Sequence, residues 1–241
     1  MEPSLIFNII AVLVIFEFLS ERVLEYLNRT RWSDELPEEV KGIYDPEEYR
    51  RSQEYLKVNS KFSFFTDTYS LALLLLMLFL GGFAWLDSFI RQYTENQVLM
   101  ALLFFGALGF ASDILSLPFS IYRTFVIEEK FGFNKTTVKT FITDKLKGWL
   151  LGLVIGGGIL ALIVWISQST GSLFWIIAWG AVTVFSIFMT LFYSDLIVPL
   201  FNKQRPLEEG ELRDAIREFA DKVDFRLSNI FVIDGSKRST K

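Results

Sequence analysis

Three carboxylates lie within or at the end of apolar runs of the sequence. Glu17 lies in the run 5–27, Asp113 in the run 98–117 and Asp195 near the end of the run 174–198. An ionisable side chain at membrane depth is expected to face protein or water rather than lipid. We therefore take these three as candidates for lining an internal polar space. A helix–helix hydrogen bond or an interfacial position is the alternative for each.

The sequence also limits the chemistry that these carboxylates could support. It contains no His and no Cys among 241 residues. This excludes disulfides, a thiol nucleophile and a thiolate metal site, and it removes the most common general base and the usual zinc ligand. We expect no catalytic or metal centre of these kinds in this chain.

The composition indicates a polytopic membrane protein with an all-α fold. Hydrophobic residues make up 51% of the chain, aromatic residues 16%, and the apolar residues are clustered. A helix rises about 1.5 Å per residue against a hydrocarbon core of roughly 30 Å. The first run lacks a basic segment before it and a small-residue cleavage site after it, so we interpret it as a retained span. Five transmembrane helices are predicted at residues 5–27, 69–90, 98–117, 149–166 and 174–198.

Two long polar segments separate these spans, at residues 28–68 and 118–148. Gly81 and Gly82 interrupt the second span, and Pro118 is expected to close the third. The apolar residues that come after Asn134 recur at helical spacing. They predict an amphipathic helix, with Asn134 as N-cap, lying along the membrane surface before the fourth span.

Lysine and arginine are distributed very unevenly between the two sides of such a protein. Seven lie between the first two spans, six between the third and fourth, and nine after the fifth, whereas only Arg91 lies in a connection on the opposite side. The basic side is cytoplasmic by the positive-inside rule. The N-terminus is therefore predicted outside or in the lumen, and the C-terminus in the cytoplasm of a bacterial or endoplasmic-reticulum membrane.

The C-terminal segment, residues 199–241, has the composition of a small soluble α/β domain. Glu208, Glu209 and Glu211 precede an apolar stripe that runs at helical spacing from Leu212 to Val223, and this pattern predicts a soluble amphipathic helix. The β-branched run 229–234 predicts a strand that ends before Gly235. We expect the partner of this strand to lie after Gly235, so that the segment is the beginning of a longer domain.

Three blocks of sequence resemble the type I CAAX prenyl proteases. The blocks are Tyr-Arg-Thr-Phe-Val-Ile-Glu-Glu-Lys-Phe-Gly-Phe-Asn at 122–134, Tyr-Ser-Asp-Leu-Ile-Val-Pro-Leu-Phe-Asn at 193–202, and Asp-Gly-Ser-Lys-Arg-Ser at 234–239. The resemblance implies an integral-membrane zinc metalloprotease in which seven helices surround a water-filled chamber. This chain would supply five of those helices and the start of the catalytic domain.

The zinc motif of that family, H-E-x-x-H, is not in this sequence. The resemblance thus implies Zn²⁺ in the complete enzyme, and an N-terminal part that is inactive alone. It places Glu17, Asp113 and Asp195 in the chamber wall. Nearer the mouth of the active site it places Asn202, Ser236, Lys237 and Arg238. The implied partners are the lipid bilayer, a peptide or prenylated protein substrate and a possible second chain with the catalytic part, but no nucleic acid.

Two other function classes are compatible with the residues. A transporter or channel subunit would use the three buried carboxylates as ion or proton relay groups, although no inverted repeat is visible in the spans. A non-catalytic membrane scaffold would need no such groups. Zinc-dependent hydrolysis of a CAAX peptide would distinguish the protease from both, and ion flux through liposomes would favour the channel.

Overall fold

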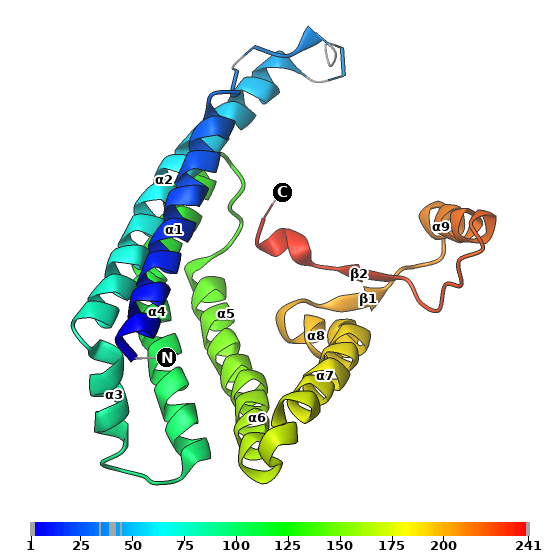
Figure 1. Ribbon diagram of the computed structural model, residues 1–241. Helices are drawn as coiled ribbons and strands as arrows, with labels where there is room; N and C mark the ends of the chain where they lie inside the picture. The colour runs from blue at the N-terminus through cyan, green and yellow to red at the C-terminus, as the bar shows by residue number, and fades with distance from the viewer. Residues whose placement is uncertain (1–2, 34, 39–41, 44, 240–241) are drawn as a thin grey trace. The chain divides into compact units, whose positions relative to one another are not determined.

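The computed structural model describes residues 3–33, 35–38, 42–43 and 45–239, and these residues are mostly helical (Figure 1). Among them, five helical stretches are long and apolar enough to cross a membrane. They run over Ser4–Arg29, Pro46–Phe79, Gln97–Glu128, Val138–Ser169 and Gly171–Phe201. The predicted class, an all-α membrane protein with five transmembrane helices, is confirmed. Lys41 and Lys241, counted above among the basic residues, lie outside the described residues.

The chain divides into two compact units, which we describe separately. Unit 1 contains Met1–Glu95 and Ala111–Gly132, and unit 2 contains Asn96–Phe110 and Phe133–Lys241. Unit 1 is built from α1 (Pro3–Arg29), α2 (Pro46–Phe79), α3 (Gly82–Ile90), the second half of α4 (Gln97–Tyr122) and the π-helix Arg123–Glu128.

Aromatic side chains join α2 to α4 within unit 1. The ring of Phe119 on α4 meets those of Phe65 and Tyr69 on α2 edge to face, with centroids 5.9 and 5.0 Å apart. Where the π-helix ends, Ile127 and Phe131 are almost fully buried. The Phe131 ring also meets that of Tyr55 on α2, so these contacts give unit 1 a small core between α2 and the stretch from Phe119 to Phe131.

The structure agrees with one expectation for unit 1 and departs from another. The interruption predicted at Gly81 and Gly82 is present, because α2 ends at Phe79 and Gly81 adopts a left-handed conformation with φ 71° before α3 begins. At its other end α2 starts at Pro46, where the Asp45 carboxylate caps the first turn. The expectation that Pro118 ends the third span was wrong, since α4 continues to Tyr122 and then into the π-helix. Proline is tolerated within membrane helices when local adjustments satisfy the freed backbone groups.

Unit 2 contains the first half of α4, two further long helical stretches and the C-terminal segment. The first stretch is α5 (Val138–Leu151), a π-helical turn (Gly152–Gly156) and α6 (Gly157–Ser169). After the short 3₁₀ turn Gly171–Leu173 come α7 (Phe174–Leu196) and α8 (Val198–Phe201). The separate surface helix expected before the fourth span is therefore absent from the described residues. The helix that starts after its N-cap, Thr137, runs on into the span without a break.

The C-terminal segment forms β1 (Gln204–Pro206), α9 (Glu211–Lys222), β2 (Phe231–Ile233) and the 3₁₀ turn η5 (Gly235–Lys237). The predicted amphipathic helix is confirmed by α9, and the predicted strand by β2. The partner expected after Gly235 does not occur among the described residues, which end at 239. β2 pairs antiparallel with β1, which precedes it, with Arg205 opposite Val232.

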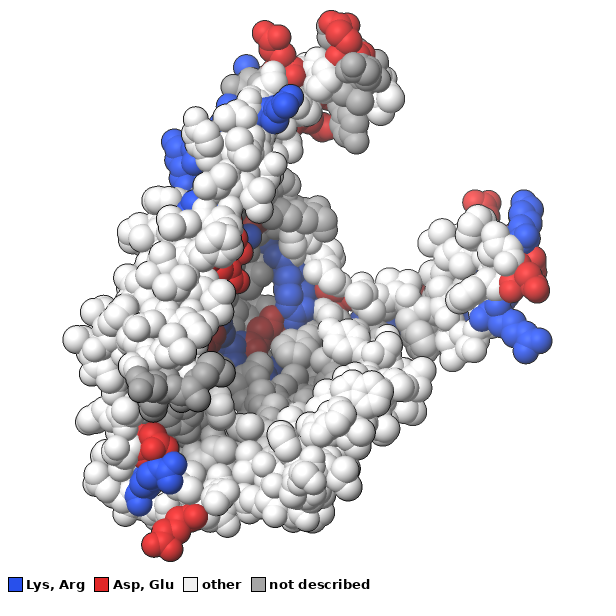
Figure 2. Space-filling view, in the orientation of Figure 1, with Lys and Arg blue, Asp and Glu red and all other residues white. Residues whose placement is uncertain are grey.

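The surface of the helices matches a lipid environment. Large apolar side chains such as Phe16, Trp165 and Trp179 are more than half exposed. In the face seen in Figure 2, charged residues are visible toward the start of α2, near the connection after α3 and on α9, as well as in the middle of the view, whereas much of the remaining surface is uncharged. A surface of this kind requires a bilayer around the long helices.

Candidate functional site

The structure places the three candidate carboxylates on three different helices. Glu17 lies on α1 and is exposed, Asp113 lies on α4 and is partly buried, and Asp195 is exposed near the end of α7. The first two belong to unit 1 and the third to unit 2. Their assignment to a chamber wall stays a prediction.

The residues present do not fit a zinc site. Among the described residues, no three Asp or Glu side chains come close enough together to hold a metal ion, and the sequence has no His or Cys. The ligand set implied by the resemblance, two His and a carboxylate, cannot be assembled from these side chains. We assign no metal-dependent step to this chain.

Three of the other predicted site residues come together at the end of the C-terminal segment. The Arg238 guanidinium donates to both carboxylate oxygens of Asp144, from Nε at 2.6 Å and from Nη2 at 2.9 Å. Its Nη1 donates to Asn202 Oδ1, and its Nη2 also donates to the Phe201 carbonyl at 2.9 Å. We call Asp144, Phe201, Asn202 and Arg238 the Arg238 cluster. All four belong to unit 2.

Lys237 makes a second contact with the same stretch. Its ammonium donates to the Phe201 carbonyl at 2.7 Å and lies 3.2 Å from the Asp234 carboxylate. The Lys203 N–H in turn donates to Asp234 Oδ1 at 2.8 Å. Ser236 is exposed in the turn η5. The segment 234–239 is thus attached to the end of α8, and its cations are engaged by protein groups.

These contacts set the charge states of the segment. The hydrogen bonds to Asp144 raise the pKa of the Arg238 guanidinium above its ordinary value. Desolvation raises the pKa of the Asp234 carboxyl, but the Lys203 N–H and the Lys237 ammonium outweigh it, and the pKa lies below its usual 3.8. Both groups are charged at neutral pH.

We expect the attachment of the segment to weaken in acid. Because the pKa of Asp234 is lower in the folded chain, its carboxylate stabilises the fold above pH 3.8, and this contribution is lost as pH falls through the lower folded value. Asp234→Asn should therefore lower the unfolding midpoint at about pH 6, by a difference that shrinks toward about pH 2.5. Thermal unfolding in detergent at both pH values measures this. An equal difference at both would contradict the pKa assignment.

Sequence reasoning missed Asp144, although it holds the fork of the Arg238 guanidinium. Asp144 lies in the charged first turns of α5, among residues typical of a solvated helix face. The two residues are 94 positions apart, so no local spacing connects them. A contact of this kind could have been found only from the fold.

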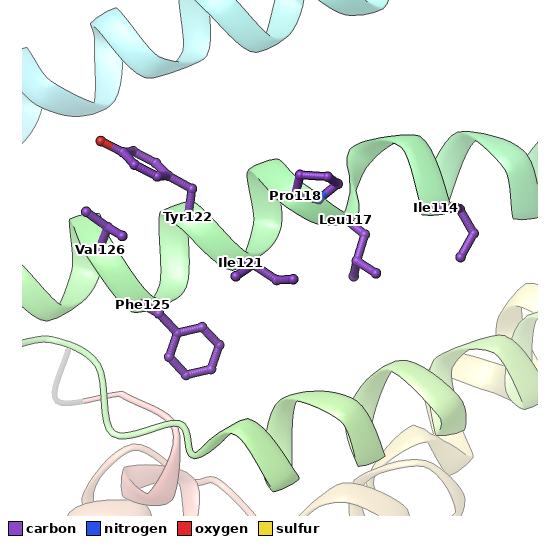
Figure 3. A pocket seen from close by; sticks show the side chains of 7 residues that line it. All are labelled: Ile114, Leu117, Pro118, Ile121, Tyr122, Phe125 and Val126. Carbon is purple, nitrogen blue, oxygen red and sulfur yellow. The ribbon is translucent and has the colours of Figure 1, made fainter.

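An apolar groove lies along the second half of α4 and the π-helix that follows it (Figure 3). It has a volume of about 460 Å³ and is lined by Ile114, Leu117, Pro118, Ile121, Tyr122, Phe125 and Val126. Ile114, Leu117, Ile121 and Phe125 extend from the same side of the helix, as their spacing of three and four residues requires. No charged side chain lines the groove, so it offers apolar contacts and no acid–base chemistry.

Most of the helical region matches a known protein family. Residues 25–203 match the family described as "CAAX prenyl protease N-terminal, five membrane helices". The chain belongs to the CAAX prenyl protease family. It is thus an integral membrane protein of a family whose named members are proteases.

Individual members of the CAAX prenyl protease family are similar over nearly the whole chain. CAAX prenyl protease 1 of Saccharomyces cerevisiae is 38% identical over 244 residues, which cover 96% of this chain and 54% of that protein. The rice homologue is 38% identical, with 85% and 50% covered. The crystal structure of S. mikatae Ste24p superposes with a TM-score of 0.89 at 37% identity, covering 97% of this chain and 56% of that one. The chain spans about half the length of these relatives.

Proposed function

We propose that this chain is the membrane-embedded N-terminal part of a zinc metalloendopeptidase of the CAAX prenyl protease type. The enzyme would cleave peptide bonds near the C-terminus of prenylated or other membrane-associated proteins. The match of residues 25–203 to the N-terminal family, together with a TM-score of 0.89 to Ste24p, carries this proposal.

The role of the chain depends on what it contains and what it lacks. Its five long helices would form part of the wall of the chamber, with Glu17, Asp113 and Asp195 as polar groups of that wall. It holds neither the His ligands nor the H-E-x-x-H motif, so we expect these 241 residues to bind no catalytic Zn²⁺ and to hydrolyse no peptide by themselves. Zn²⁺ would belong to the part of the enzyme that the match does not cover.

The small sheet is the element through which this chain would meet a substrate. β1 and β2 pair with each other, and Phe231, Val232 and Ile233 are about half exposed. A strand at the edge of a sheet has free N–H and C=O groups, to which an extended peptide can add as a further strand. This supports binding of the substrate in an extended conformation next to the C-terminal segment.

A chimera tests the proposal. The 241 residues replace the matched part of S. cerevisiae CAAX prenyl protease 1, and the purified chimera is given a farnesylated CAAX peptide. We expect release of the C-terminal tripeptide, inhibition by a zinc chelator, and no release by the 241 residues alone. A chimera that elutes as a single species from size-exclusion chromatography and cleaves nothing would contradict the proposal, and ion flux through liposomes would favour a channel.

The orientation can be tested separately because the chain contains no Cys. Gln92→Cys lies in the connection between α3 and α4, and Ser228→Cys lies before β2. With the N-terminus outside and the C-terminus in the cytoplasm, a membrane-impermeant maleimide should label the Gln92→Cys variant in intact cells. It should label the Ser228→Cys variant only after permeabilisation. The opposite labelling would reverse the proposed orientation.

A further inference from the structure

Arg238 makes an extensive set of hydrogen bonds with both its side chain and its backbone. Its guanidinium makes four hydrogen bonds to Asp144, Asn202 and Phe201. The side chains of Arg238 and Asp144 are each 25% exposed. Its own carbonyl accepts from the Lys135 N–H at 3.0 Å and from the Thr136 hydroxyl at 3.1 Å. The residue is therefore fixed through both its side chain and its backbone.

These contacts join three segments that are far apart in the sequence. They are residues 134–144, which include the start of α5, the end of α8 at 201–202, and the segment 234–239. Figure 1 draws η5, in red, near the green connection that leads into α5. A bridge between Asn134 and Ser239 continues this contact by one residue beyond Arg238.

The hydrogen bonds leave little of the guanidinium for another ligand. Arginine has five N–H donors in a planar fork that fits one carboxylate with two of them. Here the fork is taken by Asp144, and Nη1 and Nη2 have further acceptors in Asn202 and Phe201. A substrate carboxylate would have to displace Asp144 before it could bind in the same way.

We propose that Arg238 is a positioning residue, which locks the segment 234–239 onto α5 through Asp144 and thereby sets where the next part of the chain begins. This inference rests on the proposed function for its catalytic consequence, because the family match covers residues 25–203 and does not include the segment 234–239. The contact itself concerns only the 241 residues. Arg238 would then act on catalysis through the placement of the chain and not by touching the substrate.

A cysteine pair measures the lock without any activity. Asn134 and Ser239 form an antiparallel bridge, in which Cα atoms lie about 4.5–5.5 Å apart, a distance that a disulfide can span. With no native Cys, the variant Asn134→Cys/Ser239→Cys gives one intramolecular crosslink. Its rate of formation under mild oxidation should fall roughly tenfold when Arg238→Met or Asp144→Asn is added, since each removes charged hydrogen bonds.

Two further variants separate a specific ion pair from general damage. The exchange Asp144→Arg/Arg238→Asp should recover part of the crosslinking rate that each single replacement loses. Arg226→Met, an exposed arginine before β2, should leave the rate unchanged. An unchanged rate in Arg238→Met, in protein that still elutes as a single species, would overturn the proposal whether or not the family activity is present.

The chimera with the yeast protein adds the catalytic readout. If Arg238 positions the chain, Arg238→Lys and Asp144→Asn should both lower kcat by about tenfold or more with little change in KM, because the lysine cannot replace the planar fork. If Arg238 instead binds the substrate carboxylate, KM should rise in Arg238→Lys alone, while Asp144→Asn and the crosslinking rate stay normal. That second pattern would also overturn the proposal.

Discussion

Phe131→Ala should lower the unfolding midpoint of this protein more than any other single truncation in unit 1. The Phe131 side chain is only 3% exposed and its ring meets that of Tyr55 edge to face, with centroids 5.1 Å apart. Emptying such a site costs roughly 3–4 kcal/mol from lost burial and the cavity left behind. For a chain of this size that corresponds to about 10 °C in the midpoint, measurable by thermal unfolding in detergent.

The contacts around Phe131 allow a matched control. Phe16→Ala removes the same ring from α1 in the same unit, but that ring is 65% exposed, so we expect little change in the protein–protein contribution to stability. The Arg51 Nη2 donates to the Phe131 carbonyl at 2.8 Å and keeps this bond in the alanine variant. Equal midpoints for Phe131→Ala and Phe16→Ala would show that the Phe131 core contributes nothing.

Arg22→Met should give the second large loss of stability. Arg22 donates to Glu25 at 2.6 Å and to Asp67 on α2 at 2.8 Å, and its side chain is 17% exposed. Ser60 also donates to Glu25. Removal of the cation leaves two partly buried carboxylates without their partner, and we expect a cost of roughly 2–3 kcal/mol.

A second ion pair in unit 1 provides the comparison for Arg22. Arg91 and Asp87 are 2.7 Å apart at the end of α3, with side chains 59% and 45% exposed, whereas that of Arg22 is only 17% exposed. Arg91→Met should therefore leave the unfolding midpoint nearly unchanged. Adding Glu25→Gln and Asp67→Asn to Arg22→Met should recover part of the loss, because the unpaired charges are then removed. If the triple variant is no more stable than Arg22→Met, the unpaired carboxylates are not the source of the cost.

The membrane-spanning architecture could be predicted from the sequence because its signal is local. The length of an apolar run such as 174–198 predicts a membrane span directly, and the acidic residues before Leu212 indicate where α9 begins. The errors concern the ends of helices, which depend on the conformation of the residues that follow. Pro118 was expected to end a helix, but α4 continues beyond it, and Asn134 was expected to cap a helix that Thr137 caps.

The candidate site was less predictable for a different reason. Asn202, Lys237 and Arg238 were named from the resemblance, and the structure brings them to one place. Their partner Asp144 and the strand partner of β2 were not found, because both contacts join residues distant in sequence. Arg22 and Asp67 are another such pair. Composition and periodicity describe single helices and strands but not which of them meet.

Because β1 pairs with β2, the residues between the two strands form a loop whose two ends lie side by side. Residues 207–230 leave from the end of one strand and return to the start of its neighbour, as the Leu207 N–H bond to the Ile230 carbonyl illustrates at 2.9 Å. Because the strand pairing fixes both ends of this loop, a change in the length of the loop should not alter the register of the strands. The α9 region is thus a place where a tag, a shorter turn or a whole foreign domain could be grafted while the two strands stay aligned.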